Sequence, residues 1–145
     1  MILDSQARFS SAQSIAASAG TLASTDYIDT GAAADIGIGN DIMLQISIGT
    51  AVAGAGASVQ FALQSDDNAS FSTPTTFPLT AAIPVASLTA NSVQFRGRLP
   101  IGLERYVRVA YIISGATTTA GTANAFLAND LQHAPAIATT VPGVK

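Results

Sequence analysis

Four arginines lie close together in the second half of the chain. They are Arg96, Arg98, Arg105 and Arg108. The planar guanidinium fork matches carboxylates, and arginine is enriched at protein interfaces. Because side chains alternate along a strand, Arg96 and Arg98 share one face, and Arg108 joins them if the next strand pairs antiparallel across a turn at residues 100–102. These arginines are a candidate docking patch for an acidic partner; a solvated sheet face, or arginines paired with aspartates of the amino-terminal half, is the slightly favoured alternative.

A second polar group, Asp66-Asp67-Asn68 with Ser65 and Ser70, could hold a cation. Its oxygens are the ligands that calcium prefers, but their spacing does not match an EF-hand loop. A turn in which the short side chains accept hydrogen bonds from their own backbone explains the same residues. We favour the turn, and predict neither a bound metal nor another cofactor.

Other chemistries lack the residues that they need. The chain has no Cys, which excludes disulfides, thiolate nucleophiles and cysteine-based metal sites. The only Lys is Lys145, so no glycine-rich loop is a P-loop, and we interpret the glycines at 37–40 and 54–57 as turns. His133 is the single His and no G-x-S-x-G motif is present, so a hydrolase using His133 as base is not favoured. We expect a protein without enzymatic activity.

The overall charge and hydropathy exclude two further classes of partner. The net charge of −3 and the isoelectric point near 4.7 argue against a general electrostatic grip on nucleic acid. The mean hydropathy of +0.40 arises from alanine and from few charges, without an apolar stretch of about 20 residues that would span a membrane. The first residues also lack the basic region of a secretory signal. We expect a soluble protein.

The dominant periodicity is two, which is typical of strands with one buried face. It is strongest at residues 41–48 and 58–64, and the small-residue loop between them predicts a hairpin with a long connection. Residues 92–98 alternate as well. Residues 105–113 become apolar on both faces, which indicates a central strand.

Five shorter segments complete the expected set of strands: residues 8–13, 27–30, 75–79, 84–88 and 122–128. About eight short strands separated by turn residues predict an all-β fold, a jelly-roll-like antiparallel sandwich formed by a single domain over residues 1–145. Residues 10–23 are rich in Ala and Ser, and we favour an extended arm over residues 1–24, with a short helix as the alternative. Residues 131–145 are expected to form a tail.

Only 10% of the residues are charged, which is low for a free monomer and favours a subunit of an assembly. An Ala- and Ser-rich arm and a proline-containing tail, like those expected here, become ordered when they reach over a neighbouring subunit. We therefore add Ile2, Leu3 and Phe9 of the expected arm to the four arginines as candidate partner contacts.

Several segments of the chain, taken in order, resemble one known family. They are Met1-Ile2-Leu3-Asp4, Phe9-Ser10, Ala12-Gln13, Ser24-Thr25, Tyr27-Ile28-Asp29, DIGIG at residues 35–39 and VQFALQSDDNASFSTPTT at residues 59–76. In their order and in the matching length, the sequence resembles the head cement proteins of tailed bacteriophages, of the kind first described in a Bordetella phage. The motifs are strands and turns, and the resemblance provides no catalytic residues.

The resemblance implies a jelly roll that binds the outer surface of an HK97-fold capsid as a small homo-oligomer, a dimer or trimer, and bridges neighbouring capsomers. The implied partner is the major capsid protein, and the implied location is the outside of the virion after synthesis in the host cytoplasm. The alternative is a carbohydrate-binding or receptor-binding β-sandwich, suggested by the fold class and the loop at residues 66–68. Against it, Trp is absent and aromatic residues make up 6%, leaving few rings on which sugars stack.

Overall fold

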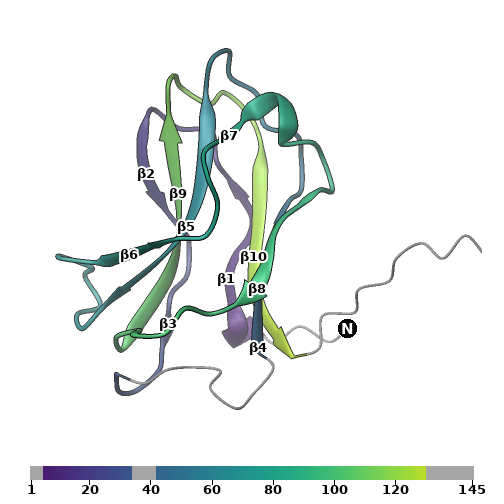
Figure 1. The fold of residues 1–145 in the computed structure, drawn as a ribbon. Helices are drawn as coiled ribbons and strands as arrows, with labels where there is room; N and C mark the ends of the chain where they lie inside the picture. The colour runs from purple at the N-terminus through teal and green to yellow at the C-terminus, as the bar shows by residue number, and fades with distance from the viewer. Residues whose placement is uncertain (1–4, 34–41, 130–145) are drawn as a thin grey trace, which may run out of the picture.

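The computed structural model describes residues 5–33 and 42–129, and within these ranges the regular structure is almost entirely β (Figure 1). The strands are β1 (Arg8–Ser14), β2 (Gly20–Ala23), β3 (Ile28–Asp29), β4 (Ile42–Ile48), β5 (Ser58–Asp66), β6 (Thr75–Pro78), β7 (Ile83–Pro84), β8 (Val93–Arg98), β9 (Tyr106–Ser114) and β10 (Thr122–Asn129). Two 3-10 turns, η1 (Ser5–Ala7) and η2 (Val85–Ser87), complete the set. The all-β prediction is confirmed. In the described ranges no helix has the length and apolar character needed to cross a bilayer.

The strands form two antiparallel sheets that face each other (Figure 1). Sheet A has the order β1-β10-β4-β8, and sheet B has the order β2-β9-β5-β6, with β3 also on β9 and β7 also on β5. Since β2 and β3 share one neighbour, and β6 and β7 share another, each pair acts as one interrupted strand. Numbered 1 to 8 on this basis, the strands run 1-8-3-6 and 2-7-4-5, which is the strand order of a jelly roll.

The core lies between the sheets and is built from alternate residues of each strand. Its largest fully buried side chains include Tyr111, Phe9 and Phe61, and the rings of Phe61 and Tyr111 meet edge to face with centroids 5.9 Å apart. The prediction of a central strand at residues 105–113 is confirmed, because β9 has strands on both sides and Ala110 is buried on its outward face. Phe9 of sheet A belongs to the same core cluster as Phe61 and Tyr111 of sheet B, so the core joins the two sheets.

The predicted hairpin between residues 41–48 and 58–64 is wrong. Strand β4 pairs with β10 and β8 in sheet A, whereas β5 pairs with β9, β6 and β7 in sheet B. The loop between them crosses from one sheet to the other, so their apolar faces meet across the core. Alternation cannot distinguish the two arrangements, because it specifies which face is buried and leaves the neighbouring strand open.

The predicted arm is also corrected over the residues that the structure describes. Residues 10–23 are extended rather than helical, but they contribute β1 to sheet A and β2 to sheet B. Phe9 and Ile15 are fully buried, and the carbonyl of Gly121 accepts a hydrogen bond from the N–H of Ile15 at 3.0 Å. Burial of these two large side chains holds the segment on the sandwich, although its Ala and Ser content gives only a weak strand signal.

Turns occur where glycine and proline predict them. Gly56 has φ of +76°, and an added Cβ on Gly54 would lie 2.5 Å from the carbonyl oxygen of Thr117, so both require glycine. The extended segment expected at residues 84–88 is shorter than predicted: after Pro84 the chain turns into η2, and buried Leu88 closes it.

Some predictions fall outside the described residues. These concern Ile2, Leu3, the DIGIG run at residues 35–39, the glycines at 37–40, His133 and the tail at residues 131–145.

Candidate functional site

The four clustered arginines are divided between the two sheets. Arg96 and Arg98 lie on β8 in sheet A, whereas Arg108 lies on β9 in sheet B and Arg105 immediately precedes it. Arg108 would join Arg96 and Arg98 only if these two strands paired across residues 100–102, and they do not. That connection passes from one sheet to the other, and its buried Leu99 packs in the core. The side chains of Arg96 and Arg108 therefore emerge on opposite outer faces.

On sheet A, four side chains form a row across the outer face. The strand register places Arg8 of β1 beside Phe126 of β10, Phe126 beside Gln45 of β4, and Gln45 beside Arg96 of β8. Arg96 donates from Nε and Nη2 to Oε1 of Gln45 at 3.0 and 2.7 Å. Arg98 lies on the same face two residues further on, beside Met43, as its spacing predicts.

This face carries charge of one sign in its described strands. Strands β1, β10, β4 and β8 contain Arg8, Arg96 and Arg98 and no Asp or Glu. The acids among the described residues lie instead in the strands of sheet B and in loops: Asp26, Asp29, Asp66, Asp67 and Glu104. A chain with a net charge of −3 thus presents a locally basic sheet.

Sequence reasoning did not connect Arg8 with the arginines of β8, because 88 positions separate Arg8 from Arg96. Only the order β1-β10-β4-β8 brings them to one face. The one available signal was that Arg8 is the single basic residue in the first half of the chain.

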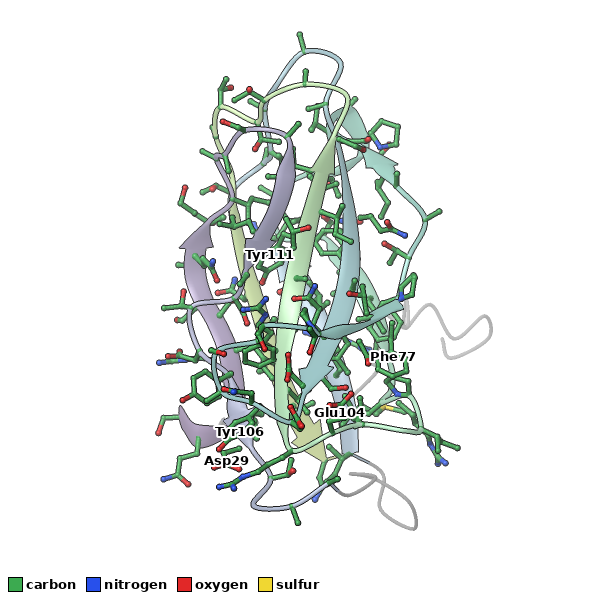
Figure 2. The ribbon with its side chains drawn as sticks, turned by 90° about the vertical axis from the view of Figure 1, so that its left-hand side faces the viewer. Asp29, Phe77, Glu104, Tyr106 and Tyr111 are labelled. Carbon is green, nitrogen blue, oxygen red and sulfur yellow. The ribbon has the colours of Figure 1, made fainter. Side chains whose placement is uncertain are left out.

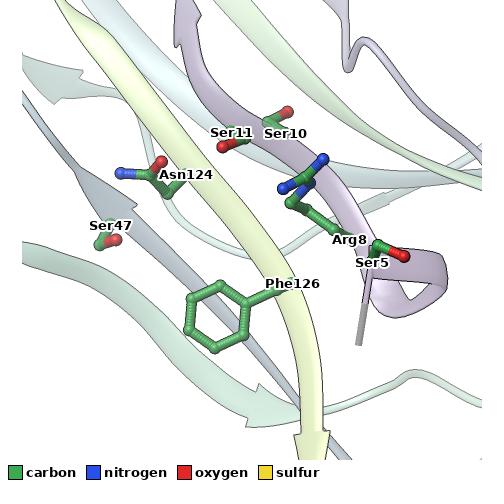
Figure 3. A pocket seen from close by; sticks show the side chains of 7 residues that line it. All are labelled: Ser5, Arg8, Ser10, Ser11, Ser47, Asn124 and Phe126. Atoms are coloured by element: carbon green, nitrogen blue, oxygen red, sulfur yellow. The ribbon is translucent and has the colours of Figure 1, made fainter. Parts of the chain in front are cut away.

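A pocket of about 260 Å³ opens on the same face, between η1, β1, β10 and β4 (Figure 3). Its lining consists of Ser5, Arg8, Ser10, Ser11, Ser47, Asn124 and Phe126. The Nε atom of Arg8 is buried and has no hydrogen-bond partner within the described residues. The described lining of this pocket is rich in hydroxyl groups and carries one cationic group, the guanidinium of Arg8.

The two arginines of sheet B are held by neighbouring side chains. Arg105 forms a two-pronged ion pair with Asp29, with Nε to Oδ1 at 2.8 Å and Nη2 to Oδ2 at 2.9 Å, which lowers the pKa of Asp29. Asp29 belongs to the amino-terminal half, so this contact matches the alternative of internally paired arginines. Figure 2 shows Asp29 and Tyr106 near each other at one end of sheet B, and Arg105 lies 4.9 Å from the Tyr106 ring centroid.

Arg108 packs against the loop that follows β5. Its guanidinium lies 4.1 Å from the centroid of the Phe71 ring, and its Nε donates to Oε1 of Gln64 at 2.9 Å. Burial lowers the pKa of Arg108. The Phe71 contact indicates that this side chain holds the loop against sheet B, and the bond to Gln64 of β5 fixes its orientation.

Phe9 lies in the core and not at the surface. It was expected to contact a partner, but its side chain is fully buried in the core and has no surface to offer. The expectation fails because Phe9 belongs to a paired strand, and its place in the alternation of β1 turns it inward.

The acidic loop adopts the turn that we favoured. Oδ1 of Asp66 accepts from the N–H of Asn68 at 2.9 Å, Oδ2 accepts from the N–H of Thr73 at 2.9 Å, and Asn68 Oδ1 accepts from the N–H of Ser70 at 3.0 Å. The bond from Asn68 is the main reason that the pKa of Asp66 is lowered. Both carboxylate oxygens of Asp66 are thus engaged by the backbone.

The side chain of Glu104 lies beside this loop, a proximity that the sequence did not indicate. Carboxylate oxygens of Asp66, Asp67 and Glu104 lie within 4.8 Å of one another (Glu104 is labelled in Figure 2). Hydrogen bonding with Asp66 raises the pKa of Asp67, and burial and the two neighbouring charges add to the effect. Ser65, proposed as a further ligand, is fully buried one position along the strand and lies on the opposite face of β5.

Comparison with known proteins places the chain in a family. No curated protein matches it. A family model described as Bbp16 matches residues 9–127, from the second residue of β1 to β10 and therefore across both sheets. Because this match covers most of the sequence and all ten described strands, the chain belongs to the Bbp16 family.

Proposed function

We propose that this protein is a structural component of a phage particle, that it binds the outer surface of the capsid, and that it bridges neighbouring capsomers to strengthen the head. The proposed partners are the major capsid protein and further copies of the chain in a small homo-oligomer, and the proposed role requires no catalysis. The observation that carries this proposal is the family match over residues 9–127, since the family's name points to a Bordetella phage protein. The resemblance to head cement proteins supplies the capsid role.

The geometry supports sheet A as the face that meets the shell. In its row, Arg8, Gln45 and Arg96 offer cationic and amide groups, and Phe126 between Arg8 and Gln45 is only 7% exposed. Arginine side chains are enriched in interfaces, and charge complementarity orients the partners. Many copies that each bind weakly through this face would hold the shell firmly by multivalency.

The alternative of a carbohydrate-binding module gains nothing from the loop that suggested it. Asp66, its first residue, uses both carboxylate oxygens to accept backbone N–H groups. We therefore do not propose a calcium-dependent sugar site there.

The test is co-sedimentation of the purified protein with capsids that lack it. We expect the wild-type protein to pellet with the capsids, and failure to pellet would overturn the proposal. The Arg96→Ala variant should bind about tenfold more weakly, which corresponds to about 1.4 kcal/mol, because arginine is enriched among the few interface residues whose truncation costs more than about 1 kcal/mol. Arg105→Ala removes the same charge from the opposite sheet and should bind like the wild type. Equal effects would show that sheet A is not the docking face.

A further inference from the structure

The pocket beside Arg8 has the features of a site that is completed by another molecule. The register of β1 on β10 shifts between Arg8 and Ser10 and again between Ser10 and Gln13, and Ala12 takes a positive φ of 46°. Such bulges redirect side chains and often occur beside functional sites. Here the irregular segment forms one wall of the pocket, and Asn124 and Phe126 of the regular strand β10 form another (Figure 3).

Two of the polar lining residues already form hydrogen bonds within the protein. Ser10 Oγ accepts from the Tyr111 hydroxyl and donates to Gln13, and Asn124 Oδ1 accepts from the N–H of Ala12 at 2.7 Å. Ser10 and Asn124 therefore hold the walls in place.

The other polar groups that line the pocket can all donate a hydrogen bond. The hydroxyls of Ser5, Ser11 and Ser47 form no hydrogen bond within the part of the chain that the structure describes. The buried Nε of Arg8 likewise has none there. A buried unpaired donor on a charged group is unfavourable. Because Nε is not accessible to solvent, an acceptor in the pocket would reach it only after the Arg8 side chain turns toward the pocket.

The charge of the lining favours an anionic occupant. Among the described residues of the lining Arg8 is the only charged one, and the described strands around it contain no acid. A guanidinium matches a carboxylate in a two-pronged arrangement. The volume of about 260 Å³ is slightly below the roughly 300–1,000 Å³ of most small-molecule sites, which suits one side chain better than a cofactor.

We propose that this pocket receives the carboxylate of a Glu or Asp side chain of the capsid subunit, with Arg8 as its main contact. The inference rests on the proposed function and names the partner group that sheet A recognises. It explains why a basic residue far from Arg96 in sequence lies in the same row.

The first experiment measures capsid binding of Arg8→Ala and Arg8→Lys by co-sedimentation across a salt series, with the thermal midpoint of each variant as a folding control. We expect Arg8→Ala to bind at least about tenfold more weakly, and Arg8→Lys to fall between it and the wild type, because lysine keeps the charge and loses the fork. If the wild type binds and Arg8→Ala binds equally well, the proposed role of the pocket is overturned and the proposed function is left intact. Wild-type protein that does not bind at all would overturn the proposed function itself.

The second experiment identifies the occupant without altering Arg8. The sequence contains no cysteine, so Ser11→Cys gives a single thiol at the exposed rim of the pocket for a photo-crosslinker. Ser72→Cys, exposed in the loop after β5, is the matched control. We expect Ser11→Cys alone to crosslink a capsid peptide that contains Asp or Glu. A capsid peptide without an acid, a crosslink to a second copy of this chain, or equal yields from both variants would overturn the proposal.

Discussion

The hydroxyl of Tyr111 on β9 donates a hydrogen bond of 2.8 Å to Oγ of Ser10 on β1, and thereby joins sheet B to sheet A inside the core. Ser10 Oγ in turn donates a hydrogen bond to Oε1 of Gln13 at 2.7 Å. The same oxygen of Gln13 accepts from the N–H of Thr25, and Gln13 Nε2 donates to the carbonyl of Ala23. This chain of bonds ties the irregular strand β1 to the opposite sheet.

Removing the Tyr111 hydroxyl should weaken this tie. We expect Tyr111→Phe and Ser10→Ala each to lower the free energy of unfolding by about 1 kcal/mol, because a buried hydrogen bond contributes roughly 0.5–1.5 kcal/mol. Urea denaturation of both single variants and the double variant measures the coupling. The double variant should lose less than the sum of the single losses, and strict additivity would show that the two groups do not interact.

The raised pKa of Tyr111 predicts a loss of stability at alkaline pH. Burial raises the pKa of Tyr111 to about 12 from an ordinary value of 10.0, with the Ser10 hydrogen bond acting in the opposite direction. The folded state therefore retains the proton that the unfolded chain releases, and the stabilisation is complete below pH 10 and declines as the pH rises toward 12. The decline should be about 1.4 kcal/mol per pH unit relative to Tyr111→Phe, which lacks the ionisable group. Parallel pH profiles for the two proteins would contradict this prediction.

Phe9 should behave as a core residue. Phe9→Ala removes a fully buried ring and should lower the free energy of unfolding by about 3–5 kcal/mol. Ser11→Ala, two positions along the same strand and exposed, should stay within about 0.5 kcal/mol of the wild type. Chemical denaturation compares the two, and a Phe9→Ala protein of unchanged stability would place this side chain at the surface after all.

The ion pair between Asp29 and Arg105 predicts a small sensitivity to acid. Because Arg105 lowers the pKa of Asp29, the pair stabilises the protein above the ordinary aspartate value of 3.8, and this stabilisation is lost as the pH falls through the lowered native value. Asp29→Asn keeps an acceptor for the N–H of Gly31, removes the charge, and replaces Oδ2, which accepts from Arg105 Nη2, with an NH2 group that cannot accept. It should be less stable than the wild type at pH 7, and this difference should shrink as the pH falls through the lowered native pKa of Asp29. The side chains are 44% and 40% exposed, so the difference should also shrink in high salt, and a difference that is constant with pH would rule out the pair as its source.

The sequence alone determined the class of fold and most of the strands. Alternation in the segment that contains Leu44, Ile46 and Ile48 specifies a buried face, because neighbouring side chains of a strand point in opposite directions. The same rule correctly placed Arg96 and Arg98 on one face. The turn at Asp66 was also local, since its side chain accepts N–H groups from residues two and seven positions ahead.

Only the tertiary structure decided which strands are neighbours and therefore which arginines share a surface. Period-two alternation is equally consistent with a hairpin and with a crossover between sheets, so it did not show that Arg108 lies opposite Arg96. It likewise did not show that Arg8 lies in the row of Arg96, because that row is completed by pairings between residues more than 40 positions apart. Long-range pairing depends on how both sheets bury their apolar faces together, and that requirement belongs to the folded chain as a whole.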